Sequence, residues 1–202
     1  MYKRQVPGLK VVTPSNPQNA YDLLLHSFVD SNPVIFMEHK LIYKIKDNVE
    51  LNDIPKESSM LGKANLIKEG NDMTIVAYSN MVNVAKEAIA AEELHNYSIE
   101  LIDLQTVSPI DYDTIKNSLK KTKRLLVCQE APSNSSVGTT VISKIVESEL
   151  FHELEVAPKL VSGLHSPMPS AKHLELNVIP QAEDIINACL LYTSPSPRDR
   201  VR

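Results

Sequence analysis

Four side chains able to do chemistry stand at or near the ends of apolar runs in this sequence. His39 and His165 each come shortly after such a run, Glu130 closes one, and Asp103 lies near the end of another. If the runs are parallel strands, their carboxyl ends form the edge at which α/β sheets present functional side chains. Histidine titrates close to neutral pH, so either histidine could face a functional site or an interface.

Each of these side chains also has a structural interpretation, which we favour. His39 could be a solvent-exposed strand end, and His165 lies in a loop whose prolines restrict the backbone. The carboxylates of Asp103 and Glu130 could accept backbone N–H bonds from the loops that follow them, or they could face a partner subunit.

The turn Asp30-Ser31-Asn32-Pro33 joins a predicted helix to a predicted strand and is rich in oxygen atoms. Such a turn, with its free carbonyl groups, can hold a hard cation. The same residues can equally form an ordinary helix C-cap. From the residue types alone we favour the cap.

Familiar catalytic motifs are missing from the sequence. The glycines form neither a GxGxxG nor a GxxxxGK[ST] phosphate loop, and the chain has no GxSxG or HExxH motif. Cys128 and Cys189 lack metal-ligand spacing, so we expect both to be buried, reduced thiols. We therefore predict no catalytic residue and no self-contained active site.

Composition narrows the class of protein. The chain has 202 residues, 43% hydrophobic and 23% charged, with a formal net charge of -4. It has no tryptophan and three phenylalanines, so we expect no nucleic acid partner. No apolar run approaches the length of a bilayer span, and residues 1–5 lack the hydrophobic core of a signal peptide, so we expect no membrane partner. These features favour the cytoplasm, or the mitochondrial matrix or a plastid in a eukaryote.

Residues 69–130 give the strongest structural signal. Apolar runs at 73–79, 98–104 and 124–129 show almost no alternation, and helical patterns at 81–95 and 111–121 separate them. Continuous apolar strands are buried on both faces, which predicts an α/β fold with a mostly parallel sheet and helices on both faces.

The flanking segments extend this pattern. Residues 6–39 read as a single β-α-β unit, with Asn16 as helix N-cap and Pro17 at the first helical position. Residues 62–68 read as a strand that a Gly-Asn turn joins to the first central strand. Further on we predict three elements, namely a helix at 138–151, a strand at 158–163 and a helix at 181–191.

Several sequence blocks, taken in order, resemble one known family. The blocks include PGLKVV, NPVIFMEHKLIY, KEGNDMTIVAYSNMV, ELIDLQTVSPID, KRLLVCQEA and SPMPSA. They are similar to the beta subunit of the thiamine diphosphate-dependent decarboxylase component of 2-oxo acid dehydrogenase complexes. The resemblance includes the pyruvate, branched-chain 2-oxo acid and acetoin types, all within the transketolase-like superfamily.

The resemblance implies a division of the chain. Residues 6–44 would be the end of a thiamine-pyrimidine-binding domain, 45–66 a linker, and 67–191 a transketolase C-terminal-like domain. Residues 1–5 and 192–202 break the pattern, and we expect them to be non-native tails on a sequence truncated at both ends.

The resemblance also implies a function, which we expect to be oxidative decarboxylation of a 2-oxo acid with acyl transfer to a lipoyl carrier. Expected partners are an alpha subunit, in a heterotetramer, and an acyltransferase core with its lipoyl domain. This part of the subunit would serve assembly and carrier docking and would be inactive alone. The alternatives are a transketolase or deoxyxylulose-phosphate synthase relative, and a non-catalytic interaction module.

Cofactors follow from the same resemblance. The intact enzyme would use thiamine diphosphate and magnesium, whose ligands we place upstream, so we expect no cofactor-binding residue here. A structural potassium ion would be held by Ser27, Phe28, Asp30 and Asn32. The chain departs from the family pattern at Gln105, Thr140 and His165, where Arg, an acidic residue and Asp are common, and this affects expected subunit or carrier contacts.

Overall fold

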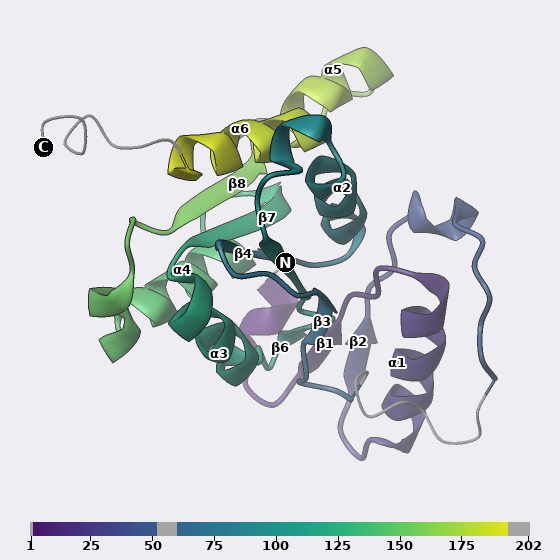
Figure 1. Ribbon diagram of the computed structural model, residues 1–202. Helices are drawn as coiled ribbons and strands as arrows, with labels where there is room; N and C mark the ends of the chain where they lie inside the picture. The colour runs from purple at the N-terminus through teal and green to yellow at the C-terminus, as the bar shows by residue number, and fades with distance from the viewer. Residues whose placement is uncertain (1, 52–59, 194–202) are drawn as a thin grey trace, which may run out of the picture.

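The computed structural model describes residues 2–51 and 60–193, which form two sheets with surrounding helices (Figure 1). The larger sheet has the strand order β3-β5-β4-β7-β8. Its strands are β3 (Asn65–Lys68), β4 (Met73–Ala77), β5 (Ile99–Asp103), β7 (Leu125–Pro132) and β8 (Lys159–Gly163). All neighbours in this sheet are parallel except β3, which pairs antiparallel with β5. The predicted α/β fold with a mostly parallel sheet is confirmed.

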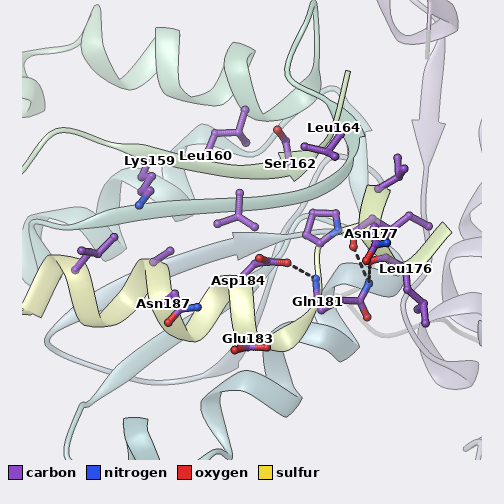
Figure 2. A pocket seen from close by; sticks show the side chains of 16 residues that line it. Lys159, Leu160, Ser162, Leu164, Leu176, Asn177, Gln181, Glu183, Asp184 and Asn187 are labelled. Carbon is purple, nitrogen blue, oxygen red and sulfur yellow. Dashed lines mark hydrogen bonds between the residues drawn. The ribbon is translucent and has the colours of Figure 1, made fainter. Parts of the chain in front are cut away.

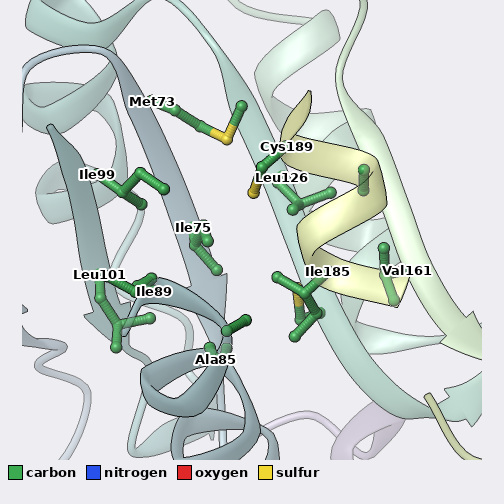
Figure 3. Packing of buried hydrophobic residues seen from close by; sticks show 14 of the residues in the cluster. Met73, Ile75, Ala85, Ile89, Ile99, Leu101, Leu126, Val161, Ile185 and Cys189 are labelled. Atoms are coloured by element: carbon green, nitrogen blue, oxygen red, sulfur yellow. The ribbon is translucent and has the colours of Figure 1, made fainter. Parts of the chain in front are cut away.

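Helices cover both faces of the larger sheet (Figure 1). They are α2 (Asn80–Ile89) and α6 (Ala182–Thr193) on one face, and α3 (Tyr112–Thr122) and α4 (Val137–Val146) on the other. Ile75 packs in the cluster beneath α2 and α6, which Figure 3 shows, whereas its neighbour Val76 packs in the cluster beneath α3 and α4. Because successive strand residues enter opposite clusters, the runs must be apolar throughout.

The predicted β-α-β unit at the start of the chain is also present. It consists of β1 (Lys10–Val12), α1 (Pro17–Val29) and β2 (Val34–Phe36), with β1 and β2 parallel. The side chain of Asn16 accepts a hydrogen bond from the Asn19 backbone N–H, at 2.9 Å, and so caps α1.

A strand that the sequence did not predict joins the two halves of the chain. Strand β6 (Thr106–Ser108) follows β5 but pairs antiparallel with β1, giving a smaller sheet of order β2-β1-β6. We call the segment from β1 through η2 (Ile42–Lys44) the amino-terminal unit, and the segment from β3 to α6 the carboxyl-terminal unit. The sheet that contains β1 therefore takes two strands from the amino-terminal unit and one from the carboxyl-terminal unit. The predicted domain division stays a prediction.

The predicted hairpin between β3 and β4 is wrong. Strand β5 lies between them, because the connecting loop passes across the start of β5. The backbone N–H groups of Asn71 and Asp72 both donate to Ser98 O at 2.8 Å. Gly70 approaches β5 so closely that a Cβ atom would lie 2.2 Å from the Ile99 carbonyl carbon. The lack of a side chain at Gly70 thus allows the two backbones to pack closely, and the residue does not form a hairpin turn.

The remaining elements are short. They are η1 (Tyr2–Gln5), η4 (Glu92–Leu94), η5 (Glu149–Glu153) and α5 (Lys172–Val178). Helices predicted at 81–95 and 138–151 end earlier, at Ile89 and Val146, and η4 and η5 follow them. Helix α5 lies between the strand predicted at 158–163 and the helix predicted at 181–191, where we predicted no element. Of the predicted linker and tails, residues 1, 52–59 and 194–202 lie outside the described residues.

Two properties of the described residues bear on the sequence expectations. Cys128 and Cys189 are both buried, as expected, and burial raises the pKa of the Cys189 thiol to about 12. Among the described helices, none combines the length and apolar character needed to cross a bilayer.

Candidate functional site

Two side chains that the sequence singled out separately meet between the two units. His39 follows β2 and Glu130 lies on β7, and His39 Nε2 is 3.0 Å from Glu130 Oε2. Their side chains are 27% and 26% exposed. The contact lies near the carboxyl ends of β2, in the smaller sheet, and β7, in the larger sheet. Each of these strands has a parallel neighbour in its own sheet, and α/β folds present functional groups at such ends.

Neighbouring donors fix this pair in one arrangement. The backbone N–H of Leu41 donates to His39 Nδ1 at 3.3 Å, so Nδ1 is an acceptor and Nε2 carries the proton given to Glu130. Asn80 Nδ2 donates to Glu130 Oε1 at 3.2 Å. The Glu130 carboxylate therefore has one protein partner on each oxygen.

A cavity of about 170 Å³ opens beside the pair. His39, Glu130 and Glu38 line it together with Tyr78, Met37 and Met81. A second cavity, of about 200 Å³, shares Glu38 and His39 and reaches toward the start of α1. The first cavity therefore lies where the amino-terminal unit meets the carboxyl-terminal unit, whereas residues 14–45 alone line the second.

The junction of β4 and α2 supplies two further features of the first cavity. Tyr78 is 6% exposed, and its hydroxyl oxygen finds no hydrogen-bond partner among the described residues. Burial, followed by the charge of Glu130, raises the Tyr78 pKa. Ser79, which also lines the cavity, has a φ of 55°, a conformation that costs free energy for any residue other than glycine.

Asp103 has a structural role, as predicted. The carboxylate is fully buried and accepts a hydrogen bond from the Ser15 hydroxyl and, at 3.0 Å, from the Gln105 backbone N–H. Asn83 Nδ2 donates to Ser15 O at 3.0 Å. Burial raises the Asp103 pKa to about 6, against the opposing effects of these hydrogen bonds and of Lys86. This network connects the segment before α1 to the larger sheet.

The predicted potassium ligands lie around the end of α1. Asp30 forms an ion pair with Lys10, and its carboxylate accepts the Asn32 backbone N–H at 2.9 Å. The Lys10 hydrogen bond is the main cause of a lowered Asp30 pKa. The Ser27 hydroxyl donates to Leu23 O at 2.7 Å, and Phe28 is 78% exposed. The turn thus acts as a cap with a lysine counter-ion, and the potassium site stays a prediction.

The described residues do not fit thiamine diphosphate with its metal. Within residues 2–51 and 60–193, no group of three or more His, Cys, Asp or Glu side chains could hold a metal ion. The sequence also has no glycine-rich phosphate loop. We therefore derive no chemical step through that cofactor. His165 is exposed on the loop after β8 and does not line either cavity beside His39.

A wider groove of about 550 Å³ lies between β8, α5 and α6 (Figure 2). Asp184 accepts the Gln181 backbone N–H at 2.8 Å, and Gln181 Nε2 donates to Ile179 O at 2.6 Å. The first of these bonds satisfies a backbone N–H just before α6. The groove contains no histidine, so the cavities beside His39 remain the candidate site.

Sequence reasoning missed several residues of this site. Tyr78 and Ser79 were assigned to the end of a strand and Asn80 to no element, although all three come directly after β4. The rule that singled out His39 and Glu130, position at a strand's carboxyl end, would have included them. Nothing local marked Ser15 as the partner of Asp103, because 88 residues separate them.

The sequence is similar to one domain family and to several enzyme beta subunits. Residues 62–185 match the family described as "Transketolase, C-terminal domain". The chain is 41% identical over 183 residues to the pyruvate dehydrogenase E1 component subunit beta of Acholeplasma laidlawii, and 40% identical over 187 residues to that of Rickettsia bellii. It is 35% identical over 185 residues to the acetoin:2,6-dichlorophenolindophenol oxidoreductase subunit beta of Cupriavidus necator.

These alignments cover most of the chain but only part of each relative. The Acholeplasma laidlawii alignment covers 89% of this chain and 54% of the relative, and the Rickettsia bellii alignment covers 91% and 55%. The Cupriavidus necator alignment covers 91% of this chain and 53% of the relative. The chain thus spans about half the length of the curated relatives it matches. A solved split-gene transketolase, described as an inactive beta4 tetramer, has a TM-score of 0.72 with 21% identity, covering 94% of this chain and 59% of that one. This likeness confirms the fold.

Proposed function

The chain belongs to the transketolase C-terminal domain family, and we propose that it forms part of the beta subunit of a 2-oxo acid dehydrogenase decarboxylase component. The enzyme would decarboxylate a 2-oxo acid oxidatively and pass the acyl group to a lipoyl carrier. This part of the subunit would hold the assembly together and dock the carrier.

One observation carries the proposal. Similarity to pyruvate dehydrogenase beta subunits extends over 89% of the chain, beyond the 62–185 match to the family and into the amino-terminal unit. The two units share a sheet through β1 and β6, and buried contacts such as Ser15–Asp103 link them. A beta subunit would need both units, whereas an isolated interaction module would need only the carboxyl-terminal unit.

A second candidate substrate has its own support. The chain is 37% identical over 187 residues to the acetoin:2,6-dichlorophenolindophenol oxidoreductase subunit beta of Bacillus subtilis. Acetoin is therefore the alternative substrate. Pyruvate is preferred because the pyruvate dehydrogenase relatives reach 40% and 41% identity.

The proposal includes a cofactor and partners that other parts of the assembly would supply. Thiamine diphosphate and magnesium would bind outside the described residues, which offer no metal cluster. An alpha subunit would complete a heterotetramer, and an acyltransferase core would present the lipoyl domain. The proposed location is the cytoplasm, or the matrix or plastid of a eukaryotic cell.

A chimeric subunit tests the proposal. Residues 6–191 of this chain would replace the aligned part of the Acholeplasma laidlawii beta subunit, which would be co-expressed with its alpha subunit. We expect the chimera to co-purify with alpha and to reduce 2,6-dichlorophenolindophenol with pyruvate in preference to acetoin or branched-chain 2-oxo acids.

The control is the unmodified beta subunit, carried through the same purification. A chimera that folds by circular dichroism but elutes as a species without alpha would contradict the proposal and favour an interaction module. Turnover with acetoin but not pyruvate would instead select the second candidate.

A further inference from the structure

We draw no further inference here: the strongest candidate, the groove between β8, α5 and α6, has Leu164, Leu176 and Leu191 exposed along it, but nothing in the structure shows what covers it.

Discussion

The two units bury their apolar residues in different ways. The carboxyl-terminal unit packs helices on both faces of its sheet and forms two clusters of fully buried side chains. The amino-terminal unit has strands of three residues, and much of its apolar surface is open to solvent. Its exposed side chains are Leu24, Phe28, Val29, Leu41 and Tyr43. Val11, one of its few buried residues, packs in a cluster of the other unit.

This difference indicates where the stability lies. A single β-α-β unit has only one helix for a sheet with two faces, so it cannot enclose its own core. The amino-terminal unit therefore depends on β6 and on polar contacts with the carboxyl-terminal unit. Four predictions test this dependence, from the largest expected effect to the smallest.

Truncating a core residue of the carboxyl-terminal unit should have the largest effect. Leu101 is buried in the cluster beneath α2 and α6, and Leu101→Ala should lower the free energy of unfolding by about 3 kcal/mol. Phe28→Ala, in the exposed face of α1, should change it by less than about 0.5 kcal/mol. Urea denaturation measures both, and equal losses would show that the amino-terminal unit has a core of its own.

Asp103 should make the junction of the units sensitive to pH. Burial raises its pKa from 3.8 to about 6 in the folded state. The folded protein therefore holds this proton better than the unfolded chain, so the contribution to stability is full below pH 3.8 and falls as pH rises through about 6.

Asp103→Asn removes this titration. At pH 7 the variant should be more stable than the native chain, by up to about 3 kcal/mol, and the gain should vanish near pH 4. Urea denaturation at both pH values gives the difference. A gain that stays the same at both would show that the carboxylate does not titrate in this range.

Substitutions at Ser79 measure the free energy that its positive-φ backbone conformation costs the folded protein. Its positive φ suits glycine, so Ser79→Gly should raise the free energy of unfolding by about 1 kcal/mol. Ser79→Ala keeps the unfavourable backbone and serves as the control. Thermal melts compare the two, and an equal effect of both substitutions would mean that the side chain, and not the backbone, matters.

The His39–Glu130 contact should mainly affect local opening of the amino-terminal unit. His39→Ala should reduce global stability by about 1 kcal/mol or less, because both side chains are partly exposed. Amide hydrogen exchange should nevertheless accelerate in β2 and stay unchanged in β5. His165→Ala, at an exposed position, is the matched control. Uniform acceleration throughout the chain would contradict a local role.

The sequence alone predicted individual elements well because their signals are local. The uninterrupted apolar runs revealed the strands of the larger sheet, since residues such as Ile75 and Val76 must enter opposite clusters. Asn16 and Pro17 marked the start of α1 through capping chemistry. The end of α2 and the presence of α5 were missed, because weak patterns at helix ends are decided by packing.

The candidate site was only half visible in the sequence for a related reason. His39 and Glu130 each attracted notice by standing near a strand end, but 91 residues separate them and no local pattern linked the two. The cavity exists because two sheets present their carboxyl ends to each other. Tyr78 and Ser79 line this cavity only because the two sheets lie together there.

The amino-acid sequence by itself determined most of the strands and helices, with β6 and α5 as the exceptions, since apolar patterns and capping depend on near neighbours. The tertiary structure alone decided that β3 pairs with β5 rather than β4, and that β6 joins β1. Which strands pair depends on the packing of the whole chain. Contacts between distant segments, such as that of Gly70 with β5, determine the order of the strands in the sheet. The spacing of residues along the sequence contains no information about such contacts.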